Sequence, residues 1–416
     1  DVTDLSPAQR NIAMVFQSYA LFPHLSVAEN IVFGLRVRRV SAADTATRLK
    51  RVAELLGLVR ERGSALARGG HPYDALLDEH DPGATRDRIG PVLRKLRDEL
   101  LVLLDAIPEA PPAAAWATAR WPDPQQEAFC RDLARAVGFD FDRGRLDRST
   151  HPFTLAAGEH DVRMTIRVDE HDPFGAIFGL LHEVGHATYD QGLADDHHQR
   201  LLGTAPGMAI HESQARLWEN QIGRSSALWR WQLPALRARF PDVLARVDLE
   251  TFLREIRRVR RGYSRVAADE VTYNLHVVLR YELEELLVSG VLAPADLPAA
   301  WNQAMVPLAG APPPDDLQGV LQDVHWALGS FGYFPSYTLG NLYAAQLFAA
   351  WERAHPTGLD AVAAGDLSPL RDWLREHVVR PGHRWTQDEL VQRATGSGLD
   401  PAPFLQHVRR RYVELE

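Results

Sequence analysis

The residues from His182 to His186 read H-E-V-G-H and place two histidines four positions apart. On a helix, side chains four residues apart lie on one face, so both imidazoles can reach a single cation. Glu183 projects to the neighbouring side, where it can act as the base for a water on that cation. Because the same motif also occurs by chance on solvated helices, the interpretation needs a third ligand.

Glu212 is the candidate third ligand, because it lies in a second stretch with a helical pattern. Ile210, Leu217 and Ile222 of that stretch can share one inner face of a helix. Catalytic zinc sites use three protein ligands and leave one position open, and two histidines with a glutamate fit that pattern. The alternative is that Glu212 is an ordinary acidic residue at a helix start, where the helix dipole favours acids.

The elements that must position these residues are predicted to be mostly helices. Residues 174–181 are apolar enough for a core helix and too few to span a bilayer. Apolar and polar residues alternate over 161–168, which predicts a strand just ahead of the motif. A strand in that place could hold an extended peptide if it formed a sheet edge.

Further helices are expected along the rest of the chain. Their predicted ranges are 91–107, 125–137 and 265–287. The basic run from Arg254 to Arg261 is expected to be mostly the solvated face of a helix.

The composition is ordinary for a globular protein, with 45% hydrophobic and 24% charged residues. The net charge of −9 and the pI of about 6.0 argue against nucleic acid and anionic membranes as partners. The single cysteine, Cys130, excludes an internal disulfide and is typical of a cytoplasmic protein. No apolar run reaches the roughly 18 residues that a membrane span needs.

Residues 1–58 differ from the remainder of the chain. The stretch 10–30 closely resembles the ATP-binding subunits of ABC importers, and the resemblance continues through the predicted helix 43–56. In that family the glutamine matched by Gln17 contacts the metal and water beside the nucleotide. The G-x-x-x-x-G-K-[ST] loop that holds the phosphates is absent from the sequence. We therefore interpret residues 1–58 as a fragment of an α/β ATPase that does not bind ATP.

From about residue 60 to 416, six motifs in order resemble the carboxypeptidase Taq family of metallocarboxypeptidases. They are H-P-F (151–153), D-x-R-x-T (161–165), H-E-x-x-H (182–186), H-E-S-Q (211–214), R-x-x-A-D (265–269) and G-x-x-Q-D-x-H-W (319–326). The resemblance implies a mainly α-helical zinc-peptidase fold with a deep groove and a small β-sheet near the metal helix. It also implies one divalent metal ion, zinc with cobalt or manganese as alternatives, and a homodimer.

Carried over position by position, the resemblance makes His182, His186 and Glu212 the metal ligands and Glu183 the general base. The implied activity is removal of single residues from peptides with a free C-terminus. A metal-activated water attacks the peptide carbonyl, while Glu183 takes its proton and returns it to the leaving amine.

The resemblance also implies a substrate site. Arg265 matches an arginine that the family is thought to use for the terminal carboxylate of the peptide, which guanidinium can bind with two hydrogen bonds. The alternative is a structural ion pair of Arg265 with Asp269 or Glu270 at helical spacing. The residues matched near the groove, with less defined roles, are His325, Tyr333 and Tyr337.

Three other functions stay open at this point. The first is an endopeptidase or aminopeptidase built on the same metal centre. The second is an impaired or inactive metal-binding fusion protein, because the ATPase-like residues 1–58 stand where the family has N-terminal helices. The third is a component of an ABC-type ATPase. On this interpretation residues 59–416 form an N-terminally truncated catalytic domain.

Overall fold

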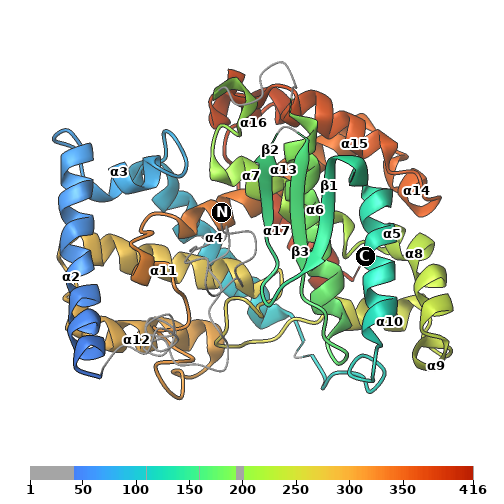
Figure 1. The fold of residues 1–416 in the computed structure, drawn as a ribbon, viewed down its shortest axis with the longest axis horizontal. Helices are drawn as coiled ribbons and strands as arrows, with labels where there is room; N and C mark the ends of the chain where they lie inside the picture. Colours follow the sequence, from blue (N-terminus) through green and yellow to red (C-terminus); the bar gives the residue numbers. More distant parts are fainter. Residues whose placement is uncertain (1–41, 109, 159, 194–200, 416) are drawn as a thin grey trace, which may run out of the picture.

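The computed structural model describes residues 42–108, 110–158, 160–193 and 201–415, and these residues are mainly α-helical with one small sheet (Figure 1). The predicted ATPase-like segment up to residue 41, including Gln17, lies outside the described residues. None of the described helices is both long and apolar enough to cross a membrane.

Among the described residues four α-helices precede the sheet. They are α2 (Ala42–Leu66), α3 (Pro72–Asp78), α4 (Arg86–Ala106) and α5 (Asp123–Val137). Helices were predicted over at least part of three of them, α2, α4 and α5. Helix α2 runs without a break through residue 58, where we predicted a domain boundary. Helix α4 starts one turn before the predicted Pro91, because Asp74 Oδ1 accepts the Arg86 backbone N–H at 2.7 Å and caps the helix.

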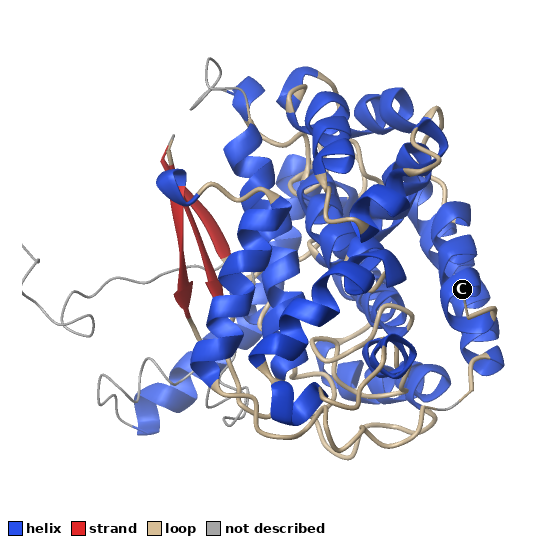
Figure 2. Cartoon of the chain, turned by 90° about the vertical axis from the view of Figure 1, so that its right-hand side faces the viewer, coloured by secondary structure: helices blue, strands red, loops and turns tan. Residues whose placement is uncertain are grey.

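The sheet has three strands, β1 (Gly144–Arg148), β2 (Thr154–Gly158) and β3 (Asp161–Ile166). The strand predicted over 161–168 is confirmed as β3, but the idea that it forms an edge is wrong. Strand β3 lies in the centre, parallel to β1 and antiparallel to β2, so its backbone groups are paired on both sides. The open edges belong to β1 and β2. Figure 2 shows the sheet as an outer layer beside the helices.

The remaining helices form the bulk of the molecule, as Figure 1 shows. They are α6 (Pro173–Gly192), α7 (Met208–Arg216), α8 (Ser226–Arg239), α9 (Pro241–Leu244), α10 (Leu249–Ile256), α11 (Thr272–Ser289), α12 (Leu297–Ala309), α13 (Phe334–Ala354), α14 (Gly358–Ala363), α15 (Ser368–Leu374), α16 (Gln387–Thr395) and α17 (Ala402–Val408). Three π-helices extend neighbouring α-helices, at Leu217–Ile222, Arg375–Val379 and Arg409–Val413.

Two helix predictions in this part were wrong in extent. The helix expected over 265–287 begins only at Thr272, because Asp269 Oδ1 accepts the backbone N–H groups of Val271 and Thr272 at 3.0 Å and caps α11 there. The basic run expected on a solvated helix leaves helix α10 after Ile256. Within that run Arg258 is largely buried and pairs with Glu255, with 2.7 Å between Arg258 Nη1 and Glu255 Oε1.

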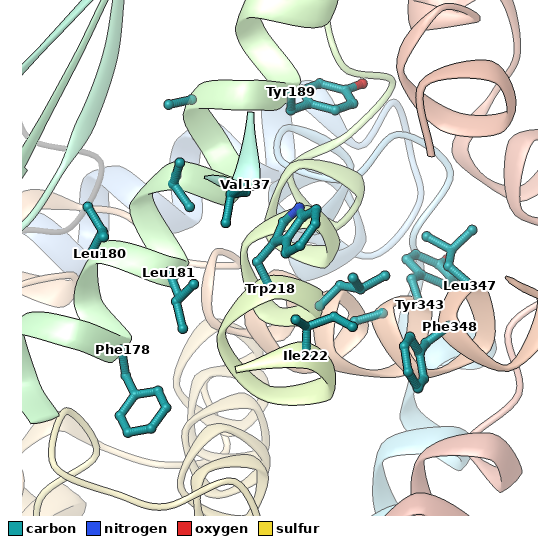
Figure 3. Close-up of a cluster of buried hydrophobic side chains, with 14 of the residues drawn as sticks. Val137, Phe178, Leu180, Leu181, Tyr189, Trp218, Ile222, Tyr343, Leu347 and Phe348 are labelled. Carbon is teal, nitrogen blue, oxygen red and sulfur yellow. The ribbon is translucent and has the colours of Figure 1, made fainter. Parts of the chain in front are cut away.

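The core is built around α6, the π-helix Leu217–Ile222 and α13. Figure 3 shows Trp218 and Ile222 of this π-helix between Leu181 of α6 and Tyr343 of α13. All four side chains are at most 3% exposed. The apolar pattern that predicted a core helix ahead of His182 is confirmed by this packing. Cys130 is likewise buried, at an apolar position of α5.

Candidate metal centre

Two glycines allow α6 and α13 to approach α7 closely. A Cβ atom at Gly185, within the H-E-V-G-H motif of α6, would lie 2.6 Å from Ala215 Cα in α7. A Cβ atom at Gly340 of α13 would lie 2.5 Å from Glu212 Cβ. Both distances are shorter than non-bonded carbon atoms tolerate, so any side chain at either position would push the helices apart. Backbone packing therefore places Glu212 against the two histidines of α6.

His182, His186 and Glu212 each bring one ligand atom into a cluster in which all three atoms lie within 4.8 Å of one another. The two histidine Nε2 atoms are 3.2 Å apart, and the nearest Glu212 oxygens lie 3.9 and 3.8 Å from them. Glu212 Oε2 is buried and has no hydrogen-bond partner among the described residues. A buried carboxylate oxygen is costly without a partner, and a cation among these three side chains would satisfy it.

His182 is held from its far side by Glu219. Its Nδ1 atom lies 2.9 Å from Glu219 Oε2, which also accepts from Arg216 Nη1 at 3.0 Å. Burial by itself would raise the pKa of Glu219, but Arg216 and His182 lower this pKa to about 2. A carboxylate that stays ionised keeps the proton on Nδ1 and leaves the Nε2 lone pair directed at the cluster.

His186 is held by a second chain of polar groups. Its Nδ1 lies 2.5 Å from His211 Nδ1, and His211 Nε2 lies 2.9 Å from Asp190 Oδ1. Burial, together with His211 and His182, lowers the pKa of His186 well below its ordinary value, so the ring is neutral. Asp190 favours the proton on His211 Nε2, which lets His211 Nδ1 accept from His186. The Nε2 atom of His186 is then the one free to bind a cation.

Glu183 is 5% exposed and lies against strand β2. Thr154 Oγ1 donates to Glu183 Oε2 at 2.8 Å, which fixes the carboxylate beside the histidines. Burial raises the pKa of Glu183 to about 7. A carboxyl group with a pKa near neutrality can both take up and release a proton in one reaction cycle.

Arg265 lies in the loop ahead of α11 and is 8% exposed. Asp323 Oδ1 accepts from its Nε at 2.9 Å and its Nη2 at 2.7 Å, and Nη1 donates to Tyr273 Oη at 3.1 Å. A guanidinium has five N–H groups, and three of them donate to these acceptors, so two have no acceptor among the described residues. The alternative ion pair at helical spacing is wrong, since Asp269 caps α11 and Glu270 pairs with Arg411.

The other predicted substrate residues gather beside Arg265. His325 Nε2 and Tyr337 Oη share a hydrogen bond at 3.2 Å, and the ring centroids of Tyr333 and Tyr337 are 5.2 Å apart. The Arg265 guanidinium carbon lies 5.2 Å from the Tyr337 ring centroid. Burial and Arg265 lower the pKa of His325 to about 3, so its imidazole is neutral.

Arg216 connects this group with the histidine cluster. Its guanidinium carbon lies 4.1 Å from the centroid of the Tyr273 ring, and its Nε atom is 3.8 Å from Glu212 Oε2. Because Tyr273 Oη accepts from Arg265, one continuous set of contacts runs from Glu212 to Arg265. All eight predicted site residues therefore belong to one buried region of the molecule.

Sequence reasoning missed the residues that hold these side chains in place. Arg216 and Glu219 stand four and seven positions after Glu212, and Asp190 stands four after His186, so helical spacing could have found them. Asp323 lies within the G-x-x-Q-D-x-H-W motif but was assigned no role. Thr154 carried no signal, because its contact with Glu183 depends on how the sheet packs against α6.

A mainly helical fold with two histidines and a glutamate around one point, and a further buried glutamate beside them, defines a metallopeptidase. The model of the family described as carboxypeptidase Taq (M32) metallopeptidase matches residues 39–412. The chain belongs to this family of metallocarboxypeptidases, which are hydrolases. The match begins ahead of residue 59, inside the segment assigned to the ATPase fragment, and the predicted boundary stays a prediction.

Two relatives illustrate the match. Thermostable carboxypeptidase 1 of Thermus thermophilus is 43% identical over 349 residues, which cover 83% of this chain and 68% of that protein. The crystal structure of the M32 carboxypeptidase from Deinococcus radiodurans superimposes with a TM-score of 0.86 at 38% identity. That superposition covers 94% of this chain and 85% of the other.

A short stretch of the chain has different relatives. The spermidine/putrescine import ATP-binding protein of Thermobifida fusca is 58% identical over 59 residues, which cover 14% of this chain and 15% of that protein. The sn-glycerol-3-phosphate import ATP-binding protein of Bordetella avium is 53% identical over 57 residues. The predicted resemblance of the N-terminal segment to ABC importer subunits is confirmed.

Proposed function

We propose that the protein removes single residues from the free C-termini of peptides in a metal-dependent reaction. The observation that carries this proposal is Arg265, whose guanidinium keeps two N–H groups for a ligand and is connected through Tyr273 and Arg216 to Glu212. A fixed cation beside a hydrolytic centre selects substrates that end in a carboxylate. An endopeptidase or an aminopeptidase does not need to bind a terminal carboxylate, so neither alternative explains the Arg265 guanidinium.

His182, His186 and Glu212 would hold one divalent ion, with zinc as the first choice and cobalt or manganese as alternatives. When bound, the ion polarises the scissile carbonyl and makes a water acidic enough to lose its proton near neutral pH. Glu212 Oε2, which accepts no hydrogen bond among the described residues, and the oriented imidazoles support this assignment. The donor set of two imidazoles and one carboxylate suits zinc.

Glu183 acts as the general base. Thr154 fixes its carboxylate, which takes the proton of the attacking water and then delivers it to the nitrogen of the leaving amino acid. The raised pKa supports both transfers. Arg265 binds the terminal carboxylate of the peptide, which sets the last peptide bond at the reacting centre. His325, Tyr333 and Tyr337 contribute the neutral polar and aromatic surface around the carboxylate.

Two further properties belong to this proposal. The protein works in the reducing cytoplasm, because its one cysteine, Cys130, is buried without a disulfide. It forms a homodimer, as the family resemblance implies, and light scattering coupled to gel filtration measures this directly. The inactive-fusion alternative predicts a folded, metal-binding protein without turnover. The ATPase alternative would require ATP hydrolysis by a sequence that has no phosphate-binding loop.

The proposal is tested by comparing a short peptide with its C-terminal amide. The wild-type protein should cleave the free acid and leave the amide nearly untouched. Arg265→Ala should lower kcat/KM for the acid by about 10- to 100-fold, the range expected for a hydrogen bond to a charged group. Arg260→Ala, on the same loop and exposed, is the matched control. Equal cleavage of acid and amide by wild type would overturn the exopeptidase assignment.

A further inference from the structure

The turn between α3 and α4 reaches the first turns of two helices that carry predicted site residues. Helix α7 begins at Met208 and carries Glu212, and helix α13 begins at Phe334 and carries Tyr337. Asp81 lies in the turn between α3 and α4 and is 2% exposed. It is not among the predicted metal, base or substrate residues. Its side chain nevertheless contacts both helices.

Helix α7 is capped from outside. Its N-cap residue is Gly207, which has no side chain to accept the N–H groups of the first turn. Those groups have no partner within the helix, so other acceptors must be found for them. The backbone oxygen of His80 accepts the Met208 N–H at 2.9 Å. Asp81 Oδ1 accepts the Ala209 N–H at 2.8 Å. The position of α7 therefore depends on the turn between α3 and α4.

The other oxygen of the same carboxylate binds α13. Ser336 Oγ donates to Asp81 Oδ2 at 2.5 Å, and Ser336 is completely buried. Ser336 and Ala209 both lie in the first turn of their helices, where the positive end of the helix dipole favours a carboxylate. Burial raises the pKa of Asp81 to about 6 against the lowering effect of these two hydrogen bonds, so the group is mostly ionised at pH 7. One buried carboxylate thus joins α7 and α13, with one oxygen on each helix.

Gly207 allows the carboxylate to approach α7. A Cβ atom at this position would lie 2.9 Å from Asp81 Oδ1, and still closer to the Oε1 atom of Gln387. Non-bonded atoms do not tolerate such distances, so any side chain at residue 207 would displace the carboxylate, Gln387 or the start of α7. The contact between Asp81 and α7 is therefore part of a closely packed region.

The two helix contacts lie next to predicted site residues. Glu212 stands three residues after Ala209, about one turn further along α7. Tyr337 directly follows Ser336 in α13. Metal sites tolerate ligand displacements of only about 0.2 Å, so a small shift of α7 would change how Glu212 shares a cation with the two histidines. A shift of α13 would likewise move the Tyr337 ring, whose centroid lies 5.2 Å from the Arg265 guanidinium carbon.

We propose that Asp81 is a positioning residue, which holds Glu212 at its distance from the two histidines of α6 and holds Tyr337 beside Arg265. This inference rests on the proposed function, because it assigns Asp81 a part in the same reaction. Asp81 itself binds neither the metal nor the substrate. It fixes the spacing between the helix that carries a metal ligand and the helix that carries a substrate residue. Through this side chain the turn between α3 and α4 controls the geometry of the metal centre.

Asp81→Ala tests the contact with α7. Metal affinity, measured by competition with a chromogenic chelator, should fall by about tenfold or more, as for other groups that orient a metal ligand. Asp74→Ala is the matched control, because Asp74 Oδ1 caps α4 at the Arg86 N–H over a similar distance of 2.7 Å. Both variants should lose stability, but Asp74→Ala should keep the metal affinity of wild type. Wild-type affinity in Asp81→Ala, or an equal loss of affinity in both variants, would overturn the proposal.

Two milder variants separate positioning from a general loss of stability. Asp81→Asn keeps an oxygen for the Ala209 N–H and should restore most of the metal affinity that Asp81→Ala loses. Ser336→Ala removes only the hydrogen bond to α13. In Ser336→Ala the KM for a free-acid peptide should rise by about threefold or more, while metal affinity stays near that of wild type. Metal affinity in Asp81→Asn as low as in Asp81→Ala, or an unchanged KM in Ser336→Ala, would contradict the positioning role.

Gly207→Ala replaces Asp81→Ala if that variant does not fold, because the added methyl group disturbs the contact and leaves every polar group in place. Its metal affinity should be lower than that of wild type, and an unchanged affinity would overturn the proposal. The comparison of a free-acid peptide with its amide uses the wild-type protein and needs none of these variants. Failure of the exopeptidase assignment is therefore distinguishable from failure of the positioning role.

Discussion

Asp323 holds Arg265 through one carboxylate oxygen, which lies 2.9 Å from Nε and 2.7 Å from Nη2 of the guanidinium. Its other oxygen accepts from Arg280 Nε at 2.6 Å. Burial by itself would raise the pKa of Asp323, but Arg265 and Arg280 lower this pKa well below its ordinary value. The carboxylate is therefore ionised. Two guanidiniums against one carboxylate leave one positive charge in excess, which the terminal carboxylate of a peptide would neutralise.

Asp323→Asn should therefore affect both stability and substrate binding. Removing the carboxylate that pairs with both arginines should lower the free energy of unfolding by about 3 kcal/mol, as for other broken buried ion pairs. Because Arg265 loses its support, KM for a free-acid peptide should rise by about tenfold or more, with a smaller change in kcat. Urea unfolding and steady-state kinetics measure the two effects. Asp316→Asn, exposed in the chain segment before Asp323, is the control, and an unchanged KM in Asp323→Asn would contradict the assigned role.

Glu219→Gln should weaken metal binding while keeping the fold. The amide cannot replace the charged acceptor of His182 Nδ1, and losing such a partner typically lowers metal affinity by about 10- to 100-fold. Competition with a chromogenic chelator measures the affinity. Glu183→Gln is the matched variant on the same helix as His182, and it should retain the metal and lose turnover. If Glu219→Gln binds metal as tightly as wild type, the orientation of His182 does not depend on this contact.

Gly340→Ala should disturb the metal centre without changing any polar group. The new methyl group would lie 2.5 Å from Glu212 Cβ, so α13 and α7 must separate. Such overpacking should lower the free energy of unfolding by about 1–3 kcal/mol. Metal affinity should also fall, because Glu212 is displaced from the two histidines. Gly57→Ala in helix α2, where the added methyl group meets no atom within 4 Å, should be neutral or slightly stabilising. Thermal unfolding and metal titration of both variants provide the comparison, and wild-type metal affinity in Gly340→Ala would count against the close-packing explanation.

Glu270→Gln should reduce the dependence of stability on acid pH. Burial by itself would raise the pKa of Glu270, but pairing with His407 and Arg411 lowers this pKa below its ordinary value of 4.5. A carboxylate with a lowered folded-state pKa stabilises the protein above pH 4.5, and this stabilisation is lost as the pH falls further. The free energy of unfolding of the variant should thus be about 3 kcal/mol lower than that of wild type at pH 7. The difference should be clearly smaller at pH values below 4.5. Denaturant unfolding across this range measures it, and a pH-independent difference would argue against the ion pair.

The sequence by itself determined the local features of this protein. The apolar pattern before His182 marks a core helix, and the four-residue spacing puts His182 and His186 on one face because helical geometry depends only on neighbouring residues. The alternation over 161–168 likewise predicts strand β3. Glu212 was predicted as the third ligand from the helix pattern and the zinc ligand set, which alone left an ordinary acidic residue open, and the six motifs in order identified the family.

Only the tertiary structure decided which distant residues meet. Whether β3 is central or at an edge depends on β1 and β2, whose pairing with it leaves no periodic mark in the sequence. For Arg265 the sequence offered a role in binding the terminal carboxylate or, as the alternative, an ion pair at helical spacing; it gave no sign of Asp323, which the loops around α11 and α13 bring to it. Thr154 reaches Glu183 only because the sheet packs on α6. Such contacts follow from the packing of whole elements in three dimensions, and a local residue pattern records which face is buried without recording what covers it.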